Sequence, residues 1–558
     1  MSSLPFKLSE ASNMWTAIKL FACVVGSCLC IVSASAQDDM HDHQMGPGEK
    51  IGHVHFPISC GMDAQMKFDQ GVALLHSFWY EKAVESFSEI TTKHPNCTIA
   101  YWGIAMTYYH PLWEKPNAEA LRNGLAAVQK GQAIKAAGTA REKDYLSAIA
   151  TFYADYDKTD HVARVLAYEK AMEQLHAKYA SDREAGVFYS LALIASALTL
   201  PPDKTYTREK KAGNILNKVL AVEPQHPGVI HYVIHAYDSP PLAPMALNAA
   251  RAYAKIAPDV PHALHMPSHI FTRLGLWQES ISSNIVSENA AKKFAADMKM
   301  DGAWDEQLHA MDYLEYAYLQ AGEDTHAKAV LDELRKITKV SPQNFKVLYA
   351  FAAIPARYAL ERGNWSEAAS LTVQPDSLPW QNVPWAEAVT HFAKGVGAAR
   401  SGDAASARRE IDRLVELEQA LGTSKEATQV KIQRLAATGW AAYAEGKTDE
   451  ALTSMRAAAD LEDTTVKHPV TPGPIIPARE LLADLLLDIK QPKSALTEYE
   501  AVLITSPNRF GALRGAAKSA ELLGDKVTAR KYYSKLVAIA AKGDRPSLSE
   551  VKAYLAKK

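Results

Sequence analysis

The chain has almost no net charge and no long apolar run beyond its N-terminus. The 61 basic residues nearly match the 63 acidic ones, and no run of five or more like charges occurs. A nucleic-acid-binding surface normally appears as a basic excess or stripe, so we expect no nucleic-acid partner. A membrane helix needs roughly 20 apolar residues, and we expect no transmembrane segment in the mature chain.

Short enzyme signatures are also missing. The sequence contains no His-Glu-x-x-His, no Gly-x-Ser-x-Gly, no phosphate-binding glycine loop and no Cys-x-x-Cys. We therefore assign no catalytic residue and favour a non-catalytic protein. A site assembled from repeats would carry no short signature, so the absence of motifs leaves catalysis open.

The N-terminus has the pattern of a secretory signal. Lys7 and Lys19 precede an apolar stretch over 20–32, and Ala-Ser-Ala at 34–36 ends it. This order predicts cleavage after residue 36 and an exported protein, periplasmic or secreted. Lipid anchoring at Cys28, which follows Val-Gly-Ser, is the weaker alternative.

Cysteine is scarce in the expected mature chain. Of five cysteines, only Cys60 and Cys97 lie beyond the signal. Cys60 precedes the first expected helix pair and Cys97 follows it, which places both at the same end of an antiparallel hairpin. In an exported protein this predicts a disulfide, with two separate thiols as the alternative.

The rest of the chain has helical periodicity, with no alternating strand-like runs. An alanine is followed by a proline 12 residues later at Ala83, Ala212, Ala246 and Ala495. Ala212, Ala246 and Ser280 are in turn spaced by 34 residues. This period and pattern resemble the tetratricopeptide (TPR) repeat over nearly all of residues 60–540.

The resemblance implies an all-α, TPR-type helical-repeat solenoid, a superhelix of about ten antiparallel helix pairs with a concave face. Stretches such as HPGVIHYVIHAYD and PHALHMPSHIFTRLG are also similar to a group of exported bacterial TPR proteins without an assigned activity.

We divide the chain by these patterns. The expected parts are a signal peptide (1–36), a disordered segment containing His and Met (37–58), an N-terminal TPR array with a His-rich groove (59–285), middle helical repeats (286–463), a Pro-rich connector (464–477) and C-terminal TPR repeats (478–558). The Pro-rich residues form either a rigid connector or a cover over the groove.

Two His-x-x-x-His motifs lie one repeat apart. They are His231/His235 and His265/His269. In TPR proteins the first helix of each pair lines the groove, and the resemblance places these four residues there. Counting to the next repeat adds Asp312 and Tyr316, with His309 one turn earlier.

These groove residues could hold a metal ion. Side chains at i and i+4 lie about 5–6 Å apart at Cβ, so two imidazoles can share one ion. Neutral imidazole suits zinc, copper or iron, and His309 or Asp312 would complete the shell. An anionic ligand is one alternative, and simple packing of duplicated histidines is another. Pro267 lies between His265 and His269 and predicts either a kink or a helix start.

Two further features remain. Residues 40–45 (Met-His-Asp-His-Gln-Met) resemble the Met/His tracts of copper-handling proteins, or are a solvated tail. In the last repeats the groove positions hold Glu480, Asp484, Arg514 and Lys518.

Three hypotheses follow. The leading one is an exported scaffold that holds an envelope protein or peptide in its groove, with Tyr316 and the four C-terminal charged residues as contacts. The second is a metal-binding or metal-dependent protein that uses the four-His groove site. The third is a structural spacer.

Overall fold

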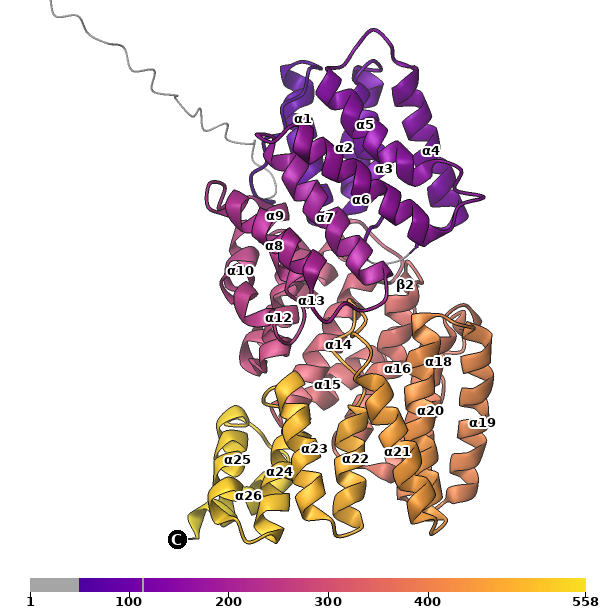
Figure 1. Ribbon diagram of the computed structural model, residues 1–558, viewed down its shortest axis with the longest axis vertical. Helices are drawn as coiled ribbons and strands as arrows, with labels where there is room; N and C mark the ends of the chain where they lie inside the picture. Colours follow the sequence, from indigo (N-terminus) through magenta and orange to yellow (C-terminus); the bar gives the residue numbers. More distant parts are fainter. Residues whose placement is uncertain (1–49, 113–114, 558) are drawn as a thin grey trace, which may run out of the picture. The chain divides into compact units, whose positions relative to one another are not determined.

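The computed structural model describes residues 50–112 and 115–557. These residues form an all-α, TPR-type array, coloured along the chain in Figure 1. The first helices are α1 (Met62–His76), α2 (Tyr80–Lys93), α3 (Thr98–Thr107), α4 (Ala118–Ala133), α5 (Ala140–Tyr153), α6 (His161–Lys178), α7 (Arg183–Thr199), α8 (Thr207–Leu220), α9 (Pro227–Ala236), α10 (Ala243–Ile256), α11 (Pro261–His265), α12 (Pro267–Leu274) and α13 (Trp277–Asp297). The later elements are β1 (Ala303–Trp304), α14 (Asp305–Gln320), α15 (Asp324–Leu334), β2 (Val340–Ser341), α16 (Phe345–Leu360), α17 (Trp365–Ala369), η1 (Trp380–Asn382), α18 (Pro384–Arg400), α19 (Ala404–Leu421), α20 (Lys425–Ala444), α21 (Thr448–Glu462), α22 (Ala478–Asp488), α23 (Pro492–Thr505), α24 (Phe510–Leu522), α25 (Lys526–Ile539) and α26 (Ser547–Ala556).

Consecutive helices pack against each other through most of the array. Local sequence sets their ends. At α5, Thr139 and Glu142 form a reciprocal capping box, which satisfies two otherwise unpaired backbone donors. The strands β1 and β2 form a short parallel pair that ties the start of α14 to the segment before α16.

The C-terminal repeats contact the middle of the array. Helix α24 packs on α14, and Trp277 donates its indole N–H to the Asn508 carbonyl at 2.8 Å. Gly275 is needed at this contact because its φ is +65° and a Cβ would lie 2.1 Å from the Pro507 carbonyl oxygen. The Arg545 guanidinium also pairs with Asp324 at 2.7 Å.

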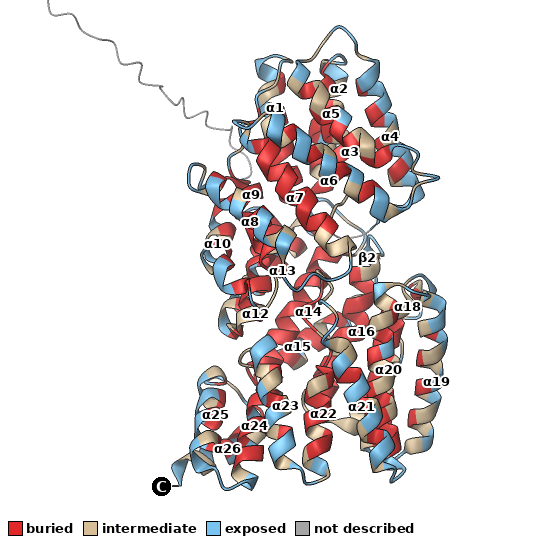
Figure 2. Cartoon of the chain, viewed as in Figure 1, coloured by how far each residue is buried: buried red, intermediate tan, exposed pale blue. Residues whose placement is uncertain are grey.

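Helix α14 lies where two apolar cores meet. One core draws mainly on residues from Ile51 to Phe271, and the other on residues from Leu308 to Val551. Every residue of α14 is buried, and the helix is red along its length in Figure 2. A helix enclosed on all sides has to bury its polar side chains as well. The polar residues of α14 are therefore where a site is expected.

The Pro-rich segment 464–477 covers this buried helix. Tyr313 on α14 donates its hydroxyl to the Thr471 carbonyl at 3.0 Å. Arg357 on α16 donates to the Gly473 carbonyl at 3.2 Å. Of the two alternatives left by the sequence, the structure shows a segment folded over the interior.

The N-terminal residues differ from expectation in part. Residues 37–49 lie outside the described chain, but 50–58 pack instead of being disordered, because Phe56 is an apolar anchor. Its ring is fully buried, and its centroid lies 5.2 Å from the ring centroid of Phe68 and 4.9 Å from that of Tyr145. The nearby Cys60 and Cys97 are joined in a disulfide, with Cα atoms 5.4 Å apart.

Among the described residues, no helix has the length and apolar character that crossing a membrane requires. The expected signal at 1–36 lies outside these residues.

Candidate metal centre

Six histidines from α9, α11, α12 and α14 gather in the interior. They form two neighbouring groups, within each of which the ligand nitrogens lie within 4.8 Å of one another. The first cluster is His231, His235 and His262, and the second cluster is His265, His269 and His309. Together we call them the six-histidine centre.

Repeat geometry brings these rings together. The Nε2 atoms of His231 and His235 lie 3.1 Å apart, as expected for side chains one helical turn apart. The Nε2 atoms of His265 and His269 also lie 3.1 Å apart. Zn–N bonds of about 2.0–2.1 Å in a tetrahedral shell place ligand nitrogens about 3.3–3.4 Å from each other. Both pairs therefore have nearly the spacing that one ion would impose.

Pro267 interrupts the helix without separating its histidines. Helix α11 ends at His265 and α12 begins at Pro267, but Met266 between them keeps helical backbone angles (φ −52°, ψ −35°). The proline removes one backbone hydrogen bond while the helical path continues. His265 thus stays one turn from His269 and faces it.

Hydrogen bonds fix the tautomers of the second cluster. His269 Nδ1 lies 3.0 Å from an Asp238 carboxylate oxygen. His265 Nδ1 lies 2.7 Å from Asn284 Oδ1, and the Asn284 amide donates to the Ser280 carbonyl at 2.8 Å, which sets its orientation. Both partners of the histidines are acceptors, so each Nδ1 carries the proton and each Nε2 presents a lone pair.

Two lone pairs then face each other at 3.1 Å, which is repulsive unless a cation lies between them. A proton is a poor candidate for that cation. Burial lowers the pKa of His265 to about 3, and burial also lowers the pKa of His269 well below its usual value. A metal ion placed between the two rings would accept both lone pairs.

The first cluster has a similar outer contact. His231 Nδ1 lies 2.6 Å from the His76 carbonyl oxygen, so its Nε2 also presents a lone pair. Metal-ligating histidines almost always donate their second ring N–H to such an oxygen, which orients the ring. Phe78 stacks on both His235 and His262, with ring centroids 5.7 Å apart in each case.

The two clusters are adjacent. The ring centroids of His235 and His269 lie 6.0 Å apart, and those of His262 and His265 lie 6.2 Å apart. Five of the six histidines are at most 5% exposed, and only His235 is half-buried. The centre is thus one enclosed, imidazole-lined region with two potential positions for an ion.

Asp238 links the centre to the Pro-rich segment. Its carboxylate also accepts from Lys467 at 2.8 Å and from Arg273 at 2.8 Å. Burial alone would raise the pKa of Asp238, but the two cations and His269 hold it well below its usual range. The carboxylate is therefore charged and keeps the His269 proton on Nδ1, so that Nε2 presents its lone pair.

Asp312 is not part of either cluster. We expected it to complete a metal shell, but its carboxylate pairs with the buried Arg357 guanidinium. Arg357 also contacts the Tyr349 hydroxyl at 3.2 Å. A carboxylate engaged by a fixed guanidinium already has its charge compensated by that cation. His262, which we did not single out, takes a place in the first cluster.

A third buried group, His76, Glu184 and His226, forms a closed hydrogen-bond network instead. The Glu184 oxygens accept from His76 Nε2 at 3.0 Å and His226 Nε2 at 2.9 Å. His76 Nδ1 contacts the Tyr232 hydroxyl at 3.0 Å, and His226 Nδ1 accepts the Val229 N–H at 3.2 Å. Each ring nitrogen has a partner of the right kind, so this group needs no ion.

The expected partner-binding residues divide into buried and exposed. Tyr316 and Glu480 are buried around Arg509, whose guanidinium lies 3.2 Å from the Tyr316 hydroxyl and 2.6 Å from Glu480. Asp484 accepts the Tyr499 hydroxyl. Arg514 and Lys518 are exposed on α24. Burial of the first two within the chain differs from the expected open groove.

No family model and no curated protein sequence matches the chain. Among solved structures, human IFIT1 with PPP-AAAA is similar at 11% identity and a TM-score of 0.36, covering 80% of this chain and 91% of that one. The TPR domain of P58(IPK) is similar at 14% identity and a TM-score of 0.21, covering 83% and 99%. At such TM-scores these likenesses carry no argument about ligand or partner.

Proposed function

We propose that the protein binds transition-metal ions at the six-histidine centre, enclosed in its helical array. The supporting observation is the pair of facing Nε2 lone pairs on His265 and His269, 3.1 Å apart. Both rings are fixed by outer hydrogen bonds to Asp238 and Asn284. Neutral imidazoles bind zinc, copper or iron without first losing a proton.

Metal analysis of the purified protein tests this proposal. The chain is prepared without a His tag or chelator, and its metal content is measured before and after incubation with zinc, copper and iron salts. We expect near-stoichiometric metal in the native protein and a loss of about tenfold or more in affinity for His265→Gln and His269→Gln.

His226→Gln is the matched control, since His226 is equally buried but lies in the closed network with Glu184. This variant loses stability but keeps its metal. Absence of metal from the native protein under all three loadings overturns the proposal. Retention of full metal affinity by both ligand variants does so as well.

We also propose that the protein is exported. The order of basic, apolar and small residues over 1–36 supports this. The Cys60–Cys97 disulfide fits an oxidising compartment. Cell fractionation combined with N-terminal sequencing tests the proposal, with a mature chain beginning at Gln37 as the expected result. An intact N-terminus in the cytosolic fraction contradicts it.

An envelope protein or peptide partner is the second candidate function. The exposed Arg514 and Lys518 on α24 support it, since they offer cationic contacts outside the covered interior. Crosslinking in cells, with Arg514→Ser/Lys518→Ser as the matched variant, tests it. A specific partner lost in the double variant is expected, and an unchanged crosslinking pattern contradicts this assignment.

A further inference from the structure

We propose that the six-histidine centre takes two copper ions, one in each cluster, and that the reduced pair binds dioxygen between them. This inference rests on the proposed metal-binding function and names the metal and the ligand of that same site. Four observations support it: the donor set, the adjacency of the clusters, the size of the neighbouring space and the aromatic wall.

The donor set is the same in both clusters. Each offers three imidazoles and no carboxylate. The two carboxylates beside the clusters are each paired with cations: Asp238, next to His269, with Lys467 and Arg273 at 2.8 Å, and Glu306, 3.6 Å from His262 Nδ1, with Lys346 at 2.5 Å. Three neutral nitrogens leave the charge of the ion uncompensated, which suits a monovalent ion better than a divalent one. Of the metals that imidazole favours, copper is the one with a stable monovalent state.

The clusters are close enough for their ions to share one small ligand. His235 and His269 face each other across the boundary with ring centroids 6.0 Å apart. His262 and His265 are separated by 6.2 Å. Two-metal sites that act jointly have ions about 3.5–4 Å apart, and clusters in such contact can reach that separation.

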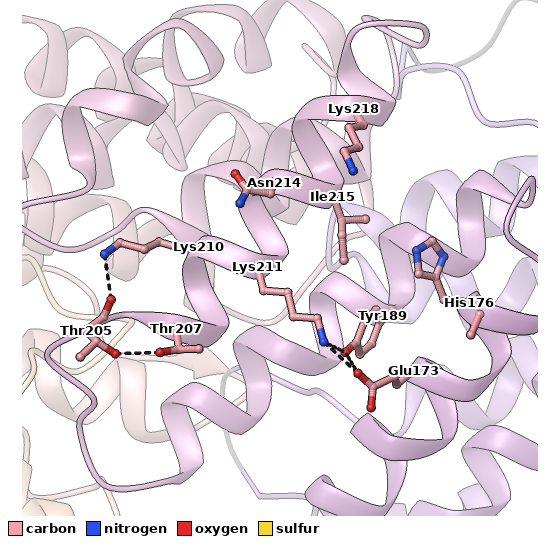
Figure 3. A pocket seen from close by; sticks show the side chains of 11 residues that line it. Glu173, His176, Tyr189, Thr205, Thr207, Lys210, Lys211, Asn214, Ile215 and Lys218 are labelled. Atoms are coloured by element: carbon pink, nitrogen blue, oxygen red, sulfur yellow. Dashed lines mark hydrogen bonds and ion pairs between the residues drawn. The ribbon is translucent and has the colours of Figure 1, made fainter.

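The space beside the centre admits only a very small molecule. A cavity of about 30 Å³ adjoins the first cluster at His262, the one of the six histidines in its lining, and is bordered by Phe78, Trp304, Glu306 and Lys346. This volume holds roughly one or two water-sized molecules. Three larger cavities, of about 690, 580 and 630 Å³, are lined by none of the six histidines. Figure 3 shows the first of these beside Lys211 and Glu173, on α8 and α6.

Aromatic side chains enclose the histidines. Phe78 stacks on His235 and His262, and Tyr313 stacks on His269 with centroids 4.9 Å apart. The Tyr313 hydroxyl is held by the Thr471 carbonyl of the Pro-rich segment. Such a wall limits water and proton access, which favours holding a bound oxygen molecule over its release as hydrogen peroxide.

The electrons balance without a further reactant. Each Cu(I) gives one electron and becomes Cu(II), and dioxygen takes both to become a bridging peroxide with its O–O bond intact. No proton is taken up, and the reverse transfer releases dioxygen. Two separate cuprous ions could not supply this electron pair to one oxygen molecule, so adjacency of the clusters is essential.

The sequence contains a second feature that points to copper. Residues 40–45 hold two methionines and two histidines within six positions. Soft thioether ligands select Cu(I) over zinc and iron. This tract lies outside the described residues.

Anaerobic loading with Cu(I), followed by dioxygen, tests the proposal on the full chain. We expect two coppers per chain, uptake of one dioxygen, an intense new near-ultraviolet absorption band and no Cu(II) signal in electron paramagnetic resonance, because the two spins couple. Removing dioxygen under vacuum reverses the band.

His309→Gln disables the second cluster, and His226→Gln is the buried control outside it. We expect His309→Gln to keep one copper, lose dioxygen uptake by about tenfold or more and show an uncoupled Cu(II) signal after oxidation. We expect His226→Gln to bind two coppers and take up dioxygen like the native protein, despite its lower stability.

The outcomes separate the two proposals. Two bound coppers that take up no dioxygen, or that oxidise to two uncoupled Cu(II) ions, overturn this inference and leave metal binding standing. Full occupancy by zinc with exclusion of copper does the same. Failure to bind any metal overturns both.

Discussion

His269 and Asp238 form the contact that joins the candidate metal centre to the Pro-rich segment. His269 Nδ1 lies 3.0 Å from one oxygen of Asp238, and Lys467 Nζ lies 2.8 Å from that same oxygen. Their positions are set by different helical repeats and by a segment whose Lys467 lies 229 residues from Asp238 in sequence. The orientation of a proposed ligand therefore depends on tertiary structure remote from its own helix.

Substituting Asp238 with asparagine should weaken metal binding. The amide cannot hold the His269 Nδ1–H as a charged acceptor does, so the ring loses its fixed tautomer and basicity. We expect a fall of about 10–100-fold in metal affinity. Competition with a chelator of known affinity measures it, with the partly exposed Asp332→Asn as control. Equal affinity in the Asp238→Asn protein contradicts the proposed role of this carboxylate.

Substituting Lys467 with methionine should loosen the Pro-rich segment. Lys467 is only 4% exposed at its side chain, and its ammonium anchors the segment to Asp238. Hydrogen bonds to charged groups contribute about 1.5–3 kcal/mol, so we expect faster amide hydrogen exchange across 464–477.

Lys518→Met is the matched control for this experiment. Its ion pair with Glu521 is at the surface, where such pairs contribute about 0–1 kcal/mol. We expect no change in exchange near the centre. Equal protection of 464–477 in the Lys467→Met and native proteins shows that other contacts hold the segment.

The repeat period accounts for how much could be predicted. The fold class follows from the 34-residue spacing, and the same spacing placed His231, His235, His265 and His269 on neighbouring helices. His262 was missed although it lies one turn before His265, because we counted only the His-x-x-x-His pairs. A histidine one helical turn from an expected ligand is therefore the sequence signal that would have identified His262.

Contacts distant in sequence could not be predicted. Asp312 has the right repeat offset for the centre, yet Arg357, 45 residues later, engages it. Local periodicity gives the face of a helix but not which cation reaches that face from another helix. The same limit applies to Glu480 and Tyr316, whose partner Arg509 comes from the C-terminal repeats.

Replacing Cys60 and Cys97 with serine should destabilise the N-terminal helices. The disulfide spans a sequence separation of 37 residues and ties the start of α1 to the start of α3. Closing a loop of this length stabilises a domain by about 2–4 kcal/mol. We expect a lower urea midpoint in the double variant, followed by near-ultraviolet circular dichroism. Reductant should lower the urea midpoint of the native protein to that of the variant and leave the midpoint of the variant unchanged. A native protein whose midpoint does not respond to reductant contradicts the prediction.

His391 should make stability depend on pH in a defined direction. Its Nδ1 lies 2.6 Å from Glu410 and its Nε2 lies 3.5 Å from Glu387. Burial alone would lower the pKa of His391, but hydrogen bonds to the two carboxylates raise it above its usual value. The folded protein thus favours the protonated ring, and this stabilisation is fully present below the unfolded pKa of about 6.5. This stabilisation is lost as the pH rises through the higher pKa that His391 has in the folded protein.

The variant His391→Gln should therefore lose more stability at about pH 5.5 than at about pH 9, relative to the native protein. Thermal unfolding midpoints at both pH values measure the difference. His326→Gln is the control, since the His326 side chain is 62% exposed and its removal should change little at either pH. A loss for His391→Gln that is equal at the two pH values, or larger at the alkaline one, contradicts the assignment. Either result would mean that the ring is neutral in the folded protein and that the two carboxylates act only through geometry.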